Sequence, residues 1–295
     1  MHYVLLGSLG NITKPLAQQL IVKGHKVTIV TSDAGKAAAI TALGATPAVG
    51  SVEDTDFLTK TFKGADAVYT MIPPKYDATD WKKWIGGVGE KYATAIKAAG
   101  VKKVLNLSSI GADKPAGIGP VSGLHLAEVA LDSHSGAAIR HLRPAYFYLN
   151  LLSTIPLIKQ AGIYGNNYGT DTGIVMVHPR DITAVAAEEL LNLDFKGSSV
   201  RYIAGDIRTG KEIAAALGAA IGKPDLPYVP FSDEDTHKAL LGAGLSKEVA
   251  DNYTEMGAGI RTGLMFDDYK KHPVTLSPTK LADFVKEFAA AYSQA

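Results

Sequence analysis

A glycine turn between an apolar, strand-like run and a helical pattern is the feature that most constrains this chain. Residues 3–6 are apolar and end at Gly7, and a second glycine, Gly10, follows three residues later. Gly24 closes the helical stretch, and a second apolar run occupies residues 27–30. The pattern predicts a buried strand, a glycine turn, a helix and a second strand. The apolar residues of the helix recur at helical spacing, at Ile12, Leu16, Leu20 and Ile21.

This turn predicts a binding site for the pyrophosphate of a dinucleotide. Gly7 permits a sharp exit from the strand, and Gly10 lets a ligand come close to the backbone, while the helix N-terminus offers free N–H groups and a partial positive charge. Thr13 stands where the usual three-glycine fingerprint has its last glycine. The alternative is a structural turn that binds nothing. The residues expected to contact the cofactor are Gly7, Ser8, Leu9, Gly10, Asn11 and Ile12.

Several classes of function are excluded by what the sequence lacks. The 295 residues carry a formal net charge of +1 without a basic stripe, so direct binding of nucleic acid is not expected. There is no cysteine, which excludes disulfides and thiolate catalysis. The histidines do not pair at ligand spacing, so no metal site is predicted. No apolar run reaches the length of a membrane span and no secretory signal is visible, which predicts a cytoplasmic protein without membrane association.

Strand-like and helical segments alternate for more than 100 residues, which predicts an α/β fold with a doubly wound, mostly parallel Rossmann sheet. Residues 1–150 are expected to form the dinucleotide-binding domain, with returning elements at about 174–205. Residues 151–295 are expected to form mainly a smaller C-terminal α/β portion that covers the substrate. Further strands are expected at 47–50, 67–71, 104–109, 139–142 and 199–204, and helices at 54–62, 81–99, 182–193, 233–241, 246–261 and 277–291.

The end of the second strand is where an enzyme of this kind reads the adenosine ribose. Thr31 and Ser32 stand there in place of a carboxylate or an arginine, and Lys36 lies within reach of a phosphate. This combination favours NADP(H) slightly over NAD(H). The fourth strand ends at Met71-Ile72-Pro73, a rigid loop that is predicted to cover the nicotinamide ribose.

Asn106-Leu107-Ser108-Ser109 at the end of the fifth strand resembles the short-chain dehydrogenase/reductase superfamily. In that superfamily a serine at the place of Ser109 holds the substrate carbonyl, and a tyrosine-lysine pair handles the proton. Residues 113–135 contain no tyrosine, so that mechanism does not transfer. A closer resemblance is to the NmrA-like family of atypical short-chain dehydrogenases, over roughly residues 1–225. Its motifs here are His125-x-x-Glu128, Leu142-Arg143-Pro144-Ala145-Tyr146-Phe147, Asn150 and His178-Pro179-Arg180-Asp181-Ile182.

The resemblance implies a cofactor more firmly than a reaction. Some members resemble NAD(P)H-dependent reductases of quinones or azo dyes, and others are cofactor-sensing regulators. Ser109 and His125 would be the catalytic polar groups; the alternative for His125 is a structural histidine that pairs with Glu128 or a backbone carbonyl. Pro144 is expected against the nicotinamide, and Arg143 in a structural ion pair. The expected substrate pocket consists of Tyr146, Tyr148, Asn150, Tyr253 and Met256.

The sequence therefore predicts an NAD(P)H-dependent oxidoreductase, an enzyme without the Tyr-x-x-x-Lys pair, acting on a quinone-like or other flat, apolar acceptor. The alternative is a non-catalytic, NAD(P)-binding redox sensor of the NmrA type. The partner is accordingly a small-molecule substrate or a regulatory protein, and the chain is expected to be a monomer or a homodimer. A sugar-nucleotide epimerase is disfavoured because the tyrosine-lysine pair is missing.

Overall fold

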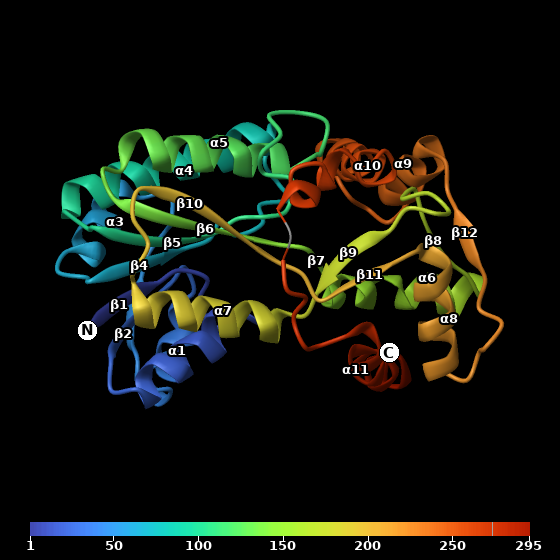
Figure 1. Cartoon of the computed structure of the whole chain (residues 1–295), viewed down its shortest axis with the longest axis horizontal. Helices are drawn as coiled ribbons and strands as arrows, with labels where there is room; N and C mark the ends of the chain where they lie inside the picture. The colour runs from blue at the N-terminus through green and yellow to red at the C-terminus, as the bar shows by residue number, and fades with distance from the viewer. Residues whose placement is uncertain (273) are drawn as a thin grey trace.

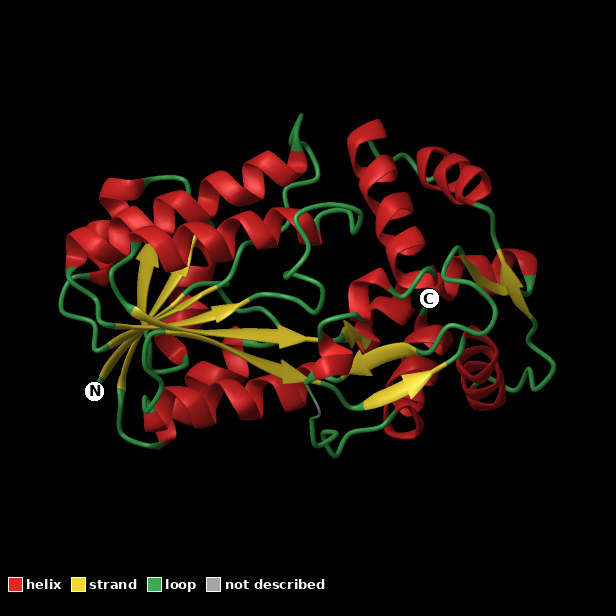
Figure 2. Ribbon diagram, turned by 45° about the horizontal axis from the view of Figure 1, so that its top comes forward, coloured by secondary structure: helices red, strands yellow, loops and turns green. Residues whose placement is uncertain are grey.

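A seven-stranded sheet forms the larger part of the molecule (Figures 1 and 2). The computed structural model describes residues 1–272 and 274–295. The strand order is β10-β6-β5-β4-β1-β2-β3, and all neighbouring strands run parallel. This is the predicted doubly wound Rossmann arrangement, in which the chain winds outward from β1 in both directions. The strands are β1 (His2–Leu5), β2 (Lys26–Thr31), β3 (Thr46–Val49), β4 (Ala67–Thr70), β5 (Lys103–Leu107), β6 (Ala138–Pro144) and β10 (Ser198–Ile203).

Alternation of side chains along each strand sends two apolar sets to opposite faces of this sheet. Tyr3 and Leu5 join the core beneath helices α1 and α7, whereas Val4 and Leu6 join the core beneath α3, α4 and α5. Figure 1 shows these two helical layers with the sheet between them. Because both faces are covered, the strands read as continuous apolar runs. The helices are α1 (Thr13–Val22), α3 (Thr55–Phe62), α4 (Trp81–Ala99), α5 (Val121–His134) and α7 (Pro179–Asn192), and α2 (Ala37–Ala42) follows the 3₁₀ turn η1 (Ala34–Lys36) after β2.

The smaller C-terminal part lies beyond the carboxyl ends of the large sheet (Figure 2). It has a three-stranded sheet in the order β11-β9-β7 and a two-stranded sheet β12-β8. The strands are β7 (Tyr146–Phe147), β8 (Tyr164–Asn166), β9 (Ile174–Val177), β11 (Asp206–Arg208) and β12 (Tyr228–Pro230). The helices are α6 (Ile155–Ala161), α8 (Gly210–Ala220), α9 (Asp233–Gly242), α10 (Lys247–Arg261) and α11 (Leu281–Gln294), with 3₁₀ segments η2 (Tyr148–Thr154), η3 (Leu264–Phe266) and η4 (Tyr269–Lys271).

Two boundaries differ from the sequence prediction. Of the returning elements expected at 174–205, α7 and β10 do rejoin the part built on the large sheet, but β9 pairs with β7 and β11 instead. This pairing is possible because the chain leaves the large sheet at Pro144 and continues as β7. The last helix begins at Leu281 rather than at residue 277. Residues 277–279 are held outside it, since the Ser277 N–H bonds the Ala204 carbonyl and Thr279 bonds the Asp181 carboxylate.

In the described part of the chain, 1–272 and 274–295, we find no helix with both the length and the apolar character needed to span a bilayer.

Candidate functional site

The glycine turn after β1 is built so that its first glycine cannot be replaced. Gly7 has a φ of +102°, which side chains rarely adopt. A Cβ atom on Gly7 would also lie only 2.4 Å from the Thr13 hydroxyl oxygen. Thr13 is buried and donates a hydrogen bond of 2.9 Å to the Leu6 carbonyl. The threonine at the place of the third glycine thus fastens the start of α1 to the end of β1.

Three backbone N–H groups of this turn indicate a binding site for an anionic ligand. The amides of Leu9, Asn11 and Ile12 have no acceptor among the described residues, whereas Gly10 donates to the Gly7 carbonyl at 3.1 Å. All three lie immediately before α1, where the partial positive charge of the helix is concentrated. Open donors at the positive end of a helix suit a phosphate or pyrophosphate, which is the chemistry the sequence predicted.

The corner after β2 differs in one respect from the prediction. The Thr31 side chain is buried, and its oxygen accepts hydrogen bonds from the Ser8 hydroxyl at 3.0 Å and from the Asp33 N–H at 3.2 Å. Thr31 therefore organises the turn instead of facing outward. Ser32 is exposed, and the Lys36 ammonium lies 3.8 Å from an Asp33 carboxylate oxygen, with both side chains about half exposed. Ser32, Asp33 and Lys36 have exposed side chains at this corner.

A cavity of about 360 Å³ opens where β4, β5 and β6 end and the C-terminal part begins. The carboxyl ends of parallel strands are where α/β proteins bind their ligands. Most of its lining is apolar or aromatic. Nine predicted residues line it: Met71, Ile72, Pro73, Ser109, Pro144, Tyr146, Asn150, Tyr253 and Met256. Lining residues that the sequence did not single out for this site include Ser108, Trp81, Ile85, Leu124, Phe147 and Met265.

The tyrosines of the cavity are neutral donors and acceptors rather than ionised groups. Burial, followed by the neighbouring Tyr168, raises the pKa of Tyr146 well above its usual range. Burial likewise raises the pKa of Tyr253, whose hydroxyl lies 3.4 Å from that of Tyr76. Trp81 makes edge-to-face contacts with both Tyr76 and Tyr253 at 5.5 Å between ring centroids, so α10 and the segment before α4 close one wall of the cavity with aromatic rings.

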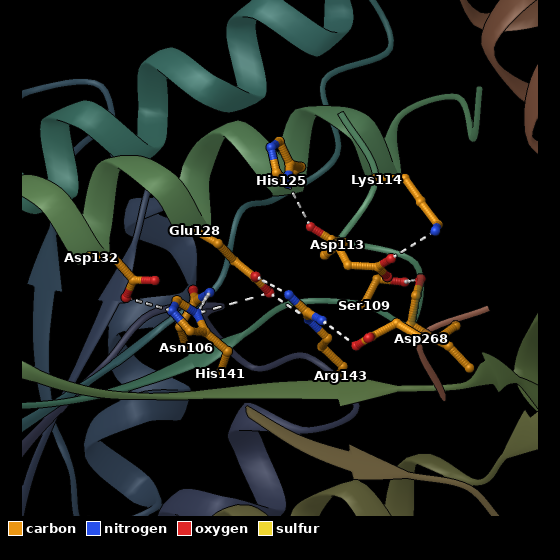
Figure 3. Close-up of polar contacts among 12 residues, drawn as sticks. Asn106, Ser109, Asp113, Lys114, His125, Glu128, Asp132, His141, Arg143 and Asp268 are labelled. Carbon is orange, nitrogen blue, oxygen red and sulfur yellow. Dashed lines mark hydrogen bonds and ion pairs between the residues drawn. The ribbon is translucent and has the colours of Figure 1, made fainter. Parts of the chain in front are cut away.

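Two predicted site residues are not brought to the cavity. His125 lies on α5, with its Nδ1 atom 2.9 Å from the Ala112 carbonyl oxygen, and it is absent from the cavity lining (Figure 3). This is the structural pairing with a backbone carbonyl that was the alternative for this histidine. Tyr148 is fully buried in the core and stacks on Phe284 at 5.6 Å, because η2 turns its side chain toward α11. A substrate-pocket role for Tyr148 does not agree with this position.

A buried polar network lies between α5 and the end of β6 (Figure 3). Arg143 makes the predicted structural ion pair, and its partner is Glu128 at 2.6 Å. His141 lies 3.0 Å from both the Asn106 amide nitrogen and an Asp132 carboxylate oxygen. Among residues 1–272 and 274–295, this network included, no three His, Asp or Glu side chains gather in a way that could hold a metal ion.

Comparison with known proteins agrees with this geometry. The sequence model of an NAD(P)H-binding family matches residues 7–144. The chain is 28% identical to the NAD(P)H azoreductase of Xenophilus azovorans over 99% of both chains. The NADPH-dependent quinone oxidoreductase of Escherichia coli, solved with NADPH, has a TM-score of 0.81 at 24% identity and covers 97% of this chain and 99% of its own. The triphenylmethane reductase of Citrobacter sp. has a TM-score of 0.78 at 20% identity, covering 98% and 100%.

The matched segment begins at the first glycine of the turn and ends at Pro144, at the edge of the cavity. It thus contains both the open backbone amides and two of the loops that line the cavity, after β4 and after β5. Residues 7–144 therefore match an NAD(P)H-binding domain, and the solved neighbours share the fold of the chain.

Proposed function

We propose that the protein is an NAD(P)H-dependent reductase of quinone-like or other flat, apolar acceptors. The observation that carries the proposal is the position of the apolar cavity, at the carboxyl ends of β4, β5 and β6 in the domain whose glycine turn offers the amides of Leu9, Asn11 and Ile12. A dinucleotide held at that turn extends along this edge of the sheet. The relatives named as azoreductase, quinone oxidoreductase and triphenylmethane reductase support the same acceptor class.

One group of residues would hold the cofactor, and a second group would shape the acceptor site. The turn at Gly7 and Gly10 would hold the pyrophosphate, and Met71, Ile72 and Pro144 would pack around the nicotinamide end. A bound reduced nicotinamide supplies a hydride, and the protein orients the acceptor against it. The aromatic wall of Trp81 and Tyr253 suits a flat ring.

The missing tyrosine-lysine pair is compatible with this chemistry. A quinone gains an aromatic ring on reduction, and the oxyanion that forms is a phenolate, which takes a proton from water without a strong acid. No cavity tyrosine needs to ionise, in keeping with the raised pKa values of Tyr146 and Tyr253.

The same proposal includes a preference for NADP(H). Lys36 and Ser32 are the side chains after β2 that would meet a 2′-phosphate, and the Asp33 carboxylate that would repel it already accepts the Gly35 N–H at 2.9 Å and lies near Lys36. Lys36→Ala should weaken binding of NADPH about tenfold and leave binding of NADH within twofold. An equal effect on both cofactors would mean that Lys36 does not contact the 2′-phosphate.

The experiment that tests the function is a fluorescence titration of the purified protein with NADPH and NADH, followed by addition of menadione. Tight binding and menadione-dependent oxidation of the cofactor are expected. Tight binding without turnover of menadione, benzoquinone or an azo dye would instead favour the sensor reading, and absence of binding would overturn both.

A further inference from the structure

Ser108 is the one cavity serine whose hydroxyl is left without a partner. It follows the last residue of β5, its N–H donates to the Leu142 carbonyl at 2.8 Å, and it is 6% exposed. Its hydroxyl oxygen is buried, and no described residue forms a hydrogen bond with it. Leaving a buried hydroxyl unpaired costs about 1–3 kcal/mol. Ser108 is also one of the residues that line the apolar cavity.

Ser109, the position singled out by the family resemblance, differs on this point. Its hydroxyl donates to the Ile110 carbonyl at 3.0 Å. A serine hydroxyl has a single proton, so Ser109 in this arrangement can accept a hydrogen bond from a ligand but cannot donate one. Neighbouring side chains of a strand project to opposite faces, and the two serines therefore approach the cavity from different sides.

The surroundings of Ser108 favour an acceptor atom that becomes negative. Val104, two turns of the pleat earlier, packs in the core beneath α4 and α5, so Ser108 faces the same helices. These helices contribute Ile85 of α4 and Val121 and Leu124 of the first turn of α5 to the cavity lining. Hydrogen bonds are stronger in such apolar surroundings, and the N-terminus of a helix adds partial positive charge.

Trp81 is the other cavity residue with an unpaired buried polar atom, its indole nitrogen. Its ring already lies edge-to-face with Tyr76 and Tyr253, an arrangement in which ring edges and ring faces attract one another. Ser108 has no comparable contact and is the clearer donor.

We propose that Ser108 is a catalytic hydrogen-bond donor for carbonyl-bearing acceptors, bonded to the acceptor oxygen that gains negative charge as hydride is transferred. The inference rests on the proposed reductase function. In the step, a C–H bond of the reduced nicotinamide breaks and its electron pair and hydrogen go to the quinone. The cofactor would be oxidised and the quinone reduced, and water would supply the single proton that completes the hydroquinone. Ser108 keeps its own proton throughout.

This role separates two classes of acceptor. When hydride adds to the central carbon of a cationic triphenylmethane dye, the positive charge disappears and no oxyanion forms. The Ser108 hydroxyl should therefore matter for quinones and not for such a dye. A serine that served only to pack the cavity would affect both acceptors alike.

The test compares Ser108→Ala and Ser108→Thr with the wild-type protein on menadione and on a cationic triphenylmethane dye. Removing one donor to a developing oxyanion typically lowers kcat about 100-fold. We expect a loss of about that size for Ser108→Ala with menadione, a change under threefold with the dye, an unchanged Kd for NADPH, and partial recovery in Ser108→Thr. Ser109→Ala should lose less with menadione than Ser108→Ala does.

Ser122→Ala is the matched control, because Ser122 is also a buried serine with an unpaired hydroxyl but lies outside the cavity lining. Equal losses of Ser108→Ala on both acceptors, full menadione activity in Ser108→Ala, or a larger loss in Ser109→Ala would overturn the inference. A weakened Kd for NADPH would make Ser108 a cofactor contact and would overturn it too. Failure of the proposed function looks different, since the wild-type protein itself would then reduce neither acceptor.

Discussion

Arg143 at the end of β6 donates two hydrogen bonds to Glu128 of α5, from Nε to Oε1 at 3.1 Å and from Nη2 to Oε2 at 2.6 Å. Both side chains are more than nine-tenths buried. The remaining guanidinium nitrogen, Nη1, lies 3.0 Å from the Tyr202 hydroxyl and 3.4 Å from an Asp268 carboxylate oxygen. One arginine thus ties α5, β10 and the segment after α10 to the strand that ends at Pro144, beside the cavity.

Replacing Glu128 by glutamine should destabilise the protein strongly. The substitution keeps the shape of the side chain but leaves the charge of Arg143 without its main buried partner, and breaking a buried pair on one side costs roughly 3 kcal/mol or more. Urea unfolding of Glu128→Gln at pH 7 measures the loss. Glu188→Gln is the control, because Glu188 pairs with Arg201 at 2.9 Å on the surface and should change stability by less than about 1 kcal/mol. Equal effects of the two substitutions would refute the importance of burial.

Two glycines of α4, only two positions apart, should respond to alanine in opposite directions. A Cβ atom on Gly89 would lie 2.5 Å from the Ala127 Cα atom in the backbone of α5, whereas one on Gly87 meets nothing within 4 Å. Gly89→Ala therefore has to push α4 and α5 apart and should cost about 1–3 kcal/mol. Gly87→Ala should stabilise the protein by about 0.5–1 kcal/mol, because glycine is a poor helix former.

Thermal unfolding of the two variants checks this pair. Since α4 and α5 both contribute residues to the cavity wall, Gly89→Ala should also raise KM for the acceptor, and Gly87→Ala should leave it unchanged. A stabilising effect of Gly89→Ala would mean that the two helices separate without cost.

The aspartate at the start of α9 gives a pH-dependent contribution to stability. Asp233 binds both terminal nitrogens of Arg261 at 2.7 and 2.8 Å, and this contact holds the pKa of its carboxyl below the ordinary value of 3.8. A carboxyl with a lowered folded-state pKa stabilises the protein fully above its ordinary pKa, and this contribution is lost as the pH falls through the folded-state value.

Asp233→Asn should therefore be less stable than the wild-type protein at pH 7, and the difference should shrink below about pH 4. Urea unfolding at a series of pH values measures it. The control is Glu234→Gln, which removes a neighbouring, more exposed carboxylate that pairs with the exposed Lys238 and should have little effect at any pH. A difference that stays constant down to pH 3 would contradict the expectation.

Local patterns predicted the elements that the chain specifies over a few residues. Apolar runs and the two glycines placed β1, the turn and α1. Met71, Ile72 and Pro73 were predicted at the site because the carboxyl ends of parallel strands gather at one edge of a sheet, and the other six predicted cavity residues followed from the family resemblance.

Contacts between distant segments were not visible in the sequence. His125 and Glu128 lie on the same helix, and their spacing suggested that they pair. In the structure His125 contacts the Ala112 carbonyl, and Glu128 pairs with Arg143. Tyr146 lines the cavity, whereas the side chain of Tyr148 points into the core. The 3₁₀ turn η2 determines this direction, and no local sequence pattern predicted that turn. The family resemblance indicated Ser109 and not Ser108. The Ser109 hydroxyl is paired because the backbone places the Ile110 carbonyl beside it, while the Ser108 hydroxyl stays unpaired, and the sequence does not show this backbone path.

Replacing Gly10 by aspartate should abolish cofactor binding without unfolding the protein. A side chain on Gly10 would meet only the Gly7 carbonyl oxygen, at 3.0 Å, so the fold can accept it with a small adjustment. The new carboxylate would sit among the free amides of Leu9, Asn11 and Ile12 and would take the place of the pyrophosphate at the positive end of α1.

We expect the Kd for NADPH to rise at least 100-fold in Gly10→Asp, with a melting temperature within a few degrees of the wild-type value. Gly87→Asp is the charge-matched control, since it adds the same carboxylate at an open position of α4 and should bind NADPH normally. Fluorescence titration measures both variants. If Gly10→Asp bound NADPH as tightly as the wild-type protein, the phosphates would have to lie elsewhere, and the turn after β1 would be a structural turn alone.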